Sequence, residues 1–329
     1  MIGYIIIPDV DVSTLTLVPQ HEHWLKDWLL DIETEISNDS VSSAWCIQGI
    51  LAEIVLYGYV QTDWKGIIKE LLKDEEGKPL AYSARYGEKL HNFSDQWKQT
   101  PIHAIYTHWW IDRYNGSDAY NINSYRDLIT RCIQPSGWIY NPNVSPTDPR
   151  TRMKAELMLS ISMGVEILSA QGLEQTQKSL FEAILSSTTL TGYLSAECFR
   201  MRTLQMLSAT SLAPYTLGEI IDLCKAEEGY CDFSVDSKVD DYMGTAKRTS
   251  RDKPIHSAIS ALHARQIAKY CALETQQAVQ SRLSNFAGYL SAYPLDIPAF
   301  RMRDIEVPFG TDLSPFEIFA ASHIISTNG

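Results

Sequence analysis

A module of two helices, one apolar and one more polar, recurs about six times along this chain of 329 residues. Two of the copies begin almost alike, with Pro101-Ile102-His103 in one and Pro254-Ile255-His256 in the other. In each copy a polar loop leads to a proline in the first helical turn, where the N–H that proline lacks would have no partner. Because an internal repeat of this length constrains architecture more than local propensity does, it predicts an all-α chain.

The repeat predicts apolar and polar helices in alternation. We expect the apolar helices near residues 41–58, 101–114, 151–168, 191–208, 254–270 and 314–326. We expect the polar helices near residues 20–36, 63–73, 122–133, 173–187, 216–226 and 273–290. The first 18 residues contain two short apolar runs around a Pro-Asp turn, and they are predicted to be extended.

Such a repeat can stack into an open solenoid or close into a ring. A solenoid needs polar capping repeats at both ends, whereas the last helix, at 314–326, is as apolar as the others. This favours an (α/α)6 toroid, a double-layered helical barrel with the apolar helices inside. We expect one domain over residues 1–329, with an open solenoid and another all-α fold as the alternatives.

Charge and hydropathy exclude several classes of partner. The formal net charge of −12 argues against nucleic-acid binding, which needs a basic face, and against attraction to anionic lipid. The apolar stretch 43–60 contains Gln48 and Glu53, so no integral membrane segment is expected.

The sequence also bears on the cellular location. The start of the chain lacks the basic region of a signal peptide. The six cysteines have no disulfide or metal spacing, so we expect a cytoplasmic protein, and peripheral membrane association stays open.

One segment, between a predicted polar helix and the next apolar helix, resembles a known repeat. Residues 133–146, with Gly137-Trp138 after a polar helix and Pro146 before the next apolar one, resemble the repeat signature of squalene–hopene cyclase-like and prenyltransferase-like α/α toroids. The chain is closest in length to a monodomain class II terpene cyclase. The resemblance implies a central cavity in which an isoprenoid substrate is protonated and cyclised. In such a cavity aromatic rings exclude water and stabilise carbocations through their π faces.

Several aromatic and basic side chains on the predicted apolar helices and in the Gly-Trp turn are candidates for substrate binding. They are Trp45, Tyr106, Trp109, Trp110, Tyr140, Tyr193, Phe199, Arg200 and Arg202. The aromatic rings could equally be core packing. Arginine forks match phosphate oxygens, so Arg200 and Arg202 could bind a prenyl diphosphate, or they could pair with acids such as Glu197.

The resemblance implies a carboxylic acid at the N-terminal end of an inner helix as the proton donor. The Asp-x-Asp-Asp motif of that family is absent here, and three single aspartates lie in loops before apolar helices: Asp148, Asp95 and Asp39. His103 and His256 could orient such an acid. The alternatives are helix caps, turn carboxylates and core histidines.

No zinc site is predicted, because the six cysteines do not have the spacing of a metal site. No cofactor is expected, although a diphosphate substrate would bring Mg²⁺. The leading interpretation is therefore a class II-type terpene or meroterpenoid cyclase acting on a small isoprenoid. The alternatives are a non-catalytic helical module that binds a peptide or lipid, and a six-hairpin glycosidase or lyase with two carboxylates in an open groove.

Overall fold

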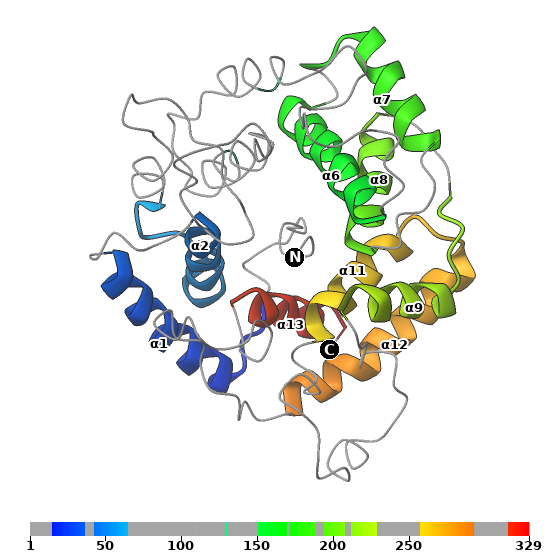
Figure 1. The fold of residues 1–329 in the computed structure, drawn as a ribbon. Helices are drawn as coiled ribbons and strands as arrows, with labels where there is room; N and C mark the ends of the chain where they lie inside the picture. The colour runs from blue at the N-terminus through cyan, green and yellow to red at the C-terminus, as the bar shows by residue number, and fades with distance from the viewer. Residues whose placement is uncertain are drawn as a thin grey trace, which may run out of the picture. The chain divides into compact units, whose positions relative to one another are not determined.

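The computed structural model describes residues 15–36, 43–64, 109, 129, 151–169, 172–187, 194–207, 212–228, 257–292 and 315–328. These residues form α-helices and short turns, and no strand occurs among them. The helices labelled in Figure 1 are α1 (Pro19–Ile36), α2 (Ser43–Tyr57), α6 (Thr151–Leu168), α7 (Gln175–Ser187), α8 (Leu194–Met206), α9 (Leu217–Glu228), α11 (Ala258–Ala268), α12 (Leu273–Ala292) and α13 (Pro315–Asn328). The predicted all-α class is confirmed for this part of the chain.

One kind of helix is buried on every side. All residues of α13 from Pro315 to Ile325 are buried, and so are all residues of α8 from Leu194 to Met201. The first two turns of α11 and the stretch 49–55 of α2 are buried in the same way. A helix that is apolar around its whole circumference lowers its free energy only when other elements cover it completely.

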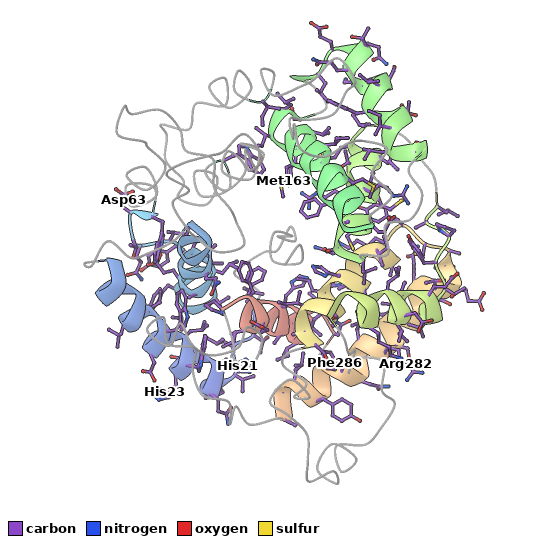
Figure 2. The ribbon with its side chains drawn as sticks, viewed as in Figure 1. His21, His23, Asp63, Met163, Arg282 and Phe286 are labelled. Atoms are coloured by element: carbon purple, nitrogen blue, oxygen red, sulfur yellow. The ribbon has the colours of Figure 1, made fainter. Side chains whose placement is uncertain are left out.

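The other kind of helix buries a single stripe. In α12 the buried residues include Val279, Leu283, Phe286 and Leu290, spaced three or four apart, and Phe286 is labelled in Figure 2. Residues at this spacing share one face of a helix, so the other faces stay in solvent. α1, α7 and α9 follow the same pattern. The alternation of apolar and amphipathic helices predicted from the sequence is thus confirmed for the helices described.

The helices group into two compact units. The first unit contains the start of α2 up to Ile50 together with α6, α7 and α8. In this unit α6 packs along α8, and Glu166 near the end of α6 bonds to Arg202 near the end of α8. Since their C-terminal turns meet, these two apolar helices run in the same direction.

The second unit contains α1, the rest of α2, α9, α11, α12 and α13. α13 packs on both α11 and α12, and the three helices lie together in Figure 1. Arg265 in the last turn of α11 bonds to Thr327 in the last turn of α13, so these apolar helices are also parallel. Gln280, in the first half of α12, bonds to Asn328 at the C-terminal end of α13 at 2.6 Å, so α12 runs the opposite way.

Two turns of the second unit are joined by hydrogen bonds. The N–H of Ala213 donates to the carbonyl oxygen of Tyr270 at 2.7 Å, and the Thr275 hydroxyl donates to the carbonyl oxygen of Tyr215 at 2.9 Å. These contacts place the start of α9 beside the start of α12. The two amphipathic helices therefore begin at the same end of the unit.

Within the second unit, the segment before α1 contacts the last turns of α13. The N–H of Thr16, just before α1, donates to the Ser326 hydroxyl near the end of α13, with an N···O distance of 2.5 Å. This contact joins positions 310 residues apart.

The predicted helix ranges agree with the structure within a few residues, and α6 occupies the predicted range 151–168. The predicted helices at 101–114 and 122–133 lie outside the described residues except for Trp109 and Ile129, which are both buried. Of the predicted helix at 63–73, the structure describes only Asp63 and Trp64. Residues 15–18 precede α1 without helical structure, and the rest of the segment predicted to be extended lies outside the described residues. The single-domain organisation stays a prediction.

Candidate functional site

Most of the residues predicted from the sequence to form a site lie outside the described part of the chain. This holds for the catalytic candidates Asp148, Asp95, Asp39, His103 and His256. It also holds for the substrate-binding candidates Tyr106, Trp110, Tyr140 and Tyr193, and for the side chain of Trp45 in α2. The described candidates are Trp109, Phe199, Arg200 and Arg202. The roles assigned to all of these residues stay predictions.

Trp109 and Phe199 are both buried. Phe199 lies within the stretch of α8 that is buried on every side. Burial fits both core packing and the wall of a closed apolar cavity, so it does not choose between the two interpretations of these rings.

Arg200 is bound inside the protein. Its Nε donates to the Glu197 carboxylate at 2.8 Å, one turn earlier in α8, and its Nη1 donates to the carbonyl oxygen of Leu185 at 3.2 Å. Glu197 is fully buried and the Arg200 side chain nearly so. A buried carboxylate needs such a charged partner, because its hydration is lost on folding. This is the pairing with Glu197 that the sequence left open as the alternative to phosphate binding.

Arg202 bonds to Glu166 at 3.0 Å, which ties α8 to α6. The Glu166 side chain is mostly buried and that of Arg202 is a quarter exposed. Together with the Arg200 pair, this contact gives both arginines a carboxylate partner. A diphosphate at either residue would have to compete with that partner.

Three carboxyl groups are buried on the apolar helices. Glu53 in α2, Glu197 in α8 and Glu317 in α13 are exposed by 3%, 0% and 5% respectively. Glu197 and Glu317 lie in the first turns of their helices. As proton donors, only aspartates in the preceding loops were considered from the sequence, and Glu197 was named only as a partner for arginine. For Glu53 and Glu317 the available signal was a lone acidic residue inside an otherwise apolar helix, because such a residue is rarely buried without a partner.

Glu197 and Glu317 are the fourth residue of α8 and the third residue of α13. The Nε of Arg200 donates to the Glu197 carboxylate. Glu317 lies in the N-terminal turn of α13, next to the buried Phe316 and Ile318.

A second polar contact lies between α11 and α13. The Arg265 guanidinium donates to Nε2 of His323 at 3.0 Å and also to the Thr327 hydroxyl. Burial, and then the positive charges of Arg265 and Lys269, lower the pKa of His323 to about 3. The imidazole is therefore neutral near pH 7, and because Nε2 accepts from arginine, its proton resides on Nδ1. Arg265, another basic residue of an apolar helix, thus links two helix C-termini, where a cation is favoured.

Among the residues that the structure describes, no cluster of three or more histidine, cysteine, aspartate or glutamate side chains could hold a metal ion. The described cysteines, Cys198, Cys224 and Cys271, are buried free thiols. None of the helices in the described ranges combines the length and hydropathy needed to cross a bilayer. Comparison with protein families, with curated proteins and with solved structures finds no match to this chain.

Proposed function

We propose that the protein is a proton-initiated cyclase of isoprenoid or hybrid isoprenoid substrates, built as a closed α/α toroid. An acid donates its proton to a terminal alkene carbon, the resulting carbocation is attacked by an internal double bond, and loss of a proton completes the ring. The substrate and product are isomers, and the donor recovers its proton. Closed, dry and aromatic surroundings are what this chemistry needs.

The arrangement of the helices supports the toroid. Parallel helices, α6 with α8 and α11 with α13, alternate along the chain with amphipathic helices that bury one stripe, and long stretches of α8, α11 and α13 are buried on every side. The bond from Thr16, just before α1, to Ser326 in α13 supports a contact between the first and last modules.

The observation that carries the proposed chemistry is the buried carboxyl group of Glu317 in the first turn of α13. The family that the sequence resembles places its acid at the N-terminal end of an inner helix, and Glu317 is a described carboxyl in such a position. Asp148, Asp95 and Asp39 lie before other apolar helices and remain the alternative donors.

The test is incubation with farnesyl and geranylgeranyl diphosphate, with Mg²⁺ or with a chelator, followed by mass spectrometry. A proton-initiated cyclase yields products that keep both the diphosphate and the mass of the substrate. A product that has lost the diphosphate indicates ionisation instead. No turnover of either diphosphate or of the corresponding alcohols would contradict the proposal.

Substitution then identifies the donor. Glu317→Gln keeps the size of the side chain and removes the acid, so cyclised product should fall at least a hundredfold. The matched control is Glu274→Gln, which makes the same change in the first turn of the amphipathic α12, where the side chain is exposed. Full activity in Glu317→Gln together with loss in Asp148→Asn, Asp95→Asn or Asp39→Asn would move the role to that aspartate.

A further inference from the structure

A cluster of basic side chains lies where the last turns of α11 and α13 meet. Arg265 and Lys269 belong to the C-terminal end of α11, and His323 and Thr327 belong to α13. The Arg265 side chain is half-buried, whereas Lys269 and Thr327 are exposed. Part of the cluster can therefore be reached from solvent, in contrast to the buried ion pair of α8.

No acid neutralises the charge of Arg265. None of the ion pairs between residues of the described ranges includes it, whereas Arg200 and Arg202 in α8 each contact a carboxylate. Burial also lowers the pKa of the Arg265 guanidinium, because part of its hydration is lost. A partly desolvated cation without an acid beside it favours the binding of an anion.

One edge of the Arg265 guanidinium is fixed and the other is open. Its Nη1 donates to Nε2 of His323 at 3.0 Å and to the Thr327 hydroxyl. The Thr327 hydroxyl donates in turn to the carbonyl oxygen of His323 at 2.7 Å, so both acceptors of Nη1 are held in place. Within the described ranges, no acceptor bonds to Nε or Nη2 of Arg265. These two nitrogens form an edge that can donate side by side to two oxygens of one anion.

The ends of the helices explain where the charge lies but leave these donors unused. The C-terminal ends of α11 and α13 favour a cation at this place. None of the described carbonyl oxygens there accepts from Nε or Nη2 of Arg265. An oxyanion from solvent can therefore bind the open edge without displacing His323 or Thr327.

Two neighbouring positive charges select the kind of anion. Lys269 follows Arg265 by four residues, on the same side of the helix, and the charges of both lower the pKa of His323. A phosphate group carries nearly two negative charges near pH 7, so it matches this pair better than a single carboxylate does. We propose that Arg265 and Lys269 bind a phosphate group of a small molecule at the open edge of the guanidinium. This inference does not depend on the proposed cyclisation.

The test is calorimetric titration of the full-length protein with pyrophosphate. Saturable binding that weakens as the salt concentration rises is expected, because the contacts are between charged groups. Citrate is the control ligand, since it carries a similar negative charge near pH 7 in carboxylate groups. Citrate should bind at least tenfold more weakly than pyrophosphate. No saturable binding of pyrophosphate, or equal affinity for citrate, would overturn the proposal.

Substitution locates the site. Arg265→Met removes the guanidinium, so affinity for pyrophosphate should fall at least tenfold. Lys26→Met removes the same charge from an exposed pair on α1 and should bind normally. If Arg265→Met does not fold, Arg265→Lys keeps the charge without the paired donors and should also bind more weakly. Unchanged affinity in the folded Arg265 variant would overturn the proposal. Pyrophosphate binding without turnover of a prenyl diphosphate would contradict the cyclase and leave this inference intact.

Discussion

At the scale of single residues, burial fixes the charge of two histidines. The pKa of His21 is lowered to about 4 and that of His323 to about 3, whereas an unfolded histidine titrates near 6.5. Above pH 6.5 both groups are neutral in either state and do not affect stability. As the pH falls below 6.5, the unfolded chain binds protons that the folded chain does not, so the free energy of unfolding decreases.

Unfolding in urea should therefore show a pH-dependent loss of stability between pH 6.5 and 5. The slope from each of the two histidines rises from about 0.7 kcal/mol per pH unit at pH 6.5, where the unfolded imidazole is half protonated, towards about 1.4 kcal/mol per pH unit near pH 5. His323→Gln keeps an oxygen that can accept from Arg265 and should remove one histidine's share of the slope. His23→Gln, at an exposed histidine of α1, is the comparison variant. A slope in His323→Gln equal to that of the wild type would contradict this assignment.

The buried ion pair of α8 makes a second prediction at this scale. Arg200→Met removes the charge beside the buried Glu197, and the isolated carboxylate should lower the free energy of unfolding by about 3–5 kcal/mol. Replacing both residues, with Glu197→Leu added, should restore most of that loss. Lys26→Met, which breaks the exposed pair with Glu22, should have little effect. Denaturant midpoints of the four proteins measure these changes.

The double variant also separates structure from function at Arg200. If the pair only stabilises α8, a folded double variant should bind and convert a prenyl diphosphate as the wild type does. A large rise in the KM for the diphosphate in a variant of normal stability would instead support the diphosphate-binding role predicted from the sequence.

At the scale of elements, the sequence predicted where helices lie better than what their polar residues do. Hydrophobic period and proline placement were enough for the range 151–168 of α6, because both are local properties of the chain. The capping box of α9 was equally readable: Glu219 accepts from the N–H of Thr216 at 2.8 Å, three residues earlier. In contrast, the partners of Arg202 and Arg265 lie on other helices, and no local pattern shows which acid, hydroxyl or imidazole they meet.

A close contact at α2 gives a prediction for an element. A Cβ atom added to Gly49 would lie 2.2 Å from the Trp64 ring, so only glycine lets the ring pack against the helix. Gly49→Ala should lower the free energy of unfolding by about 1–3 kcal/mol. Trp64→Phe removes the ring atoms that the added Cβ would meet. Gly49→Ala should therefore lower the free energy of unfolding by less in the Trp64→Phe variant than in the wild type. Gly288→Ala in α12 meets nothing within 4 Å and should stabilise by about 0.5–1 kcal/mol. Thermal melts of the variants test the contrast.

At the scale of the whole molecule, the sequence argument for closure rested on the apolar last helix. The structure adds that the described parts of both chain ends, 15–36 and 315–328, belong to one compact unit. The sequence showed that α13 is apolar. It did not show that Ser326 of α13 contacts Thr16, because a contact between residues 310 positions apart leaves no local pattern in the sequence. The sequence offered one criterion for a proton donor, an aspartate in the loop before a predicted apolar helix. This criterion selects Asp148, Asp95 and Asp39, and it excludes Glu317 because Glu317 lies inside its helix.

A cross-link between the chain ends tests closure directly. Thr16 and Ser326 are in contact, so Thr16→Cys with Ser326→Cys should form an intramolecular disulfide under mild oxidation. Closing so long a loop restricts the unfolded chain, and the oxidised protein should melt several degrees higher than its reduced form. Each single variant is the control, because it shows whether the new thiol pairs with any of the six native cysteines, of which Cys198, Cys224 and Cys271 are buried. An open solenoid would keep the two ends apart, and its double variant would give only disulfides between molecules.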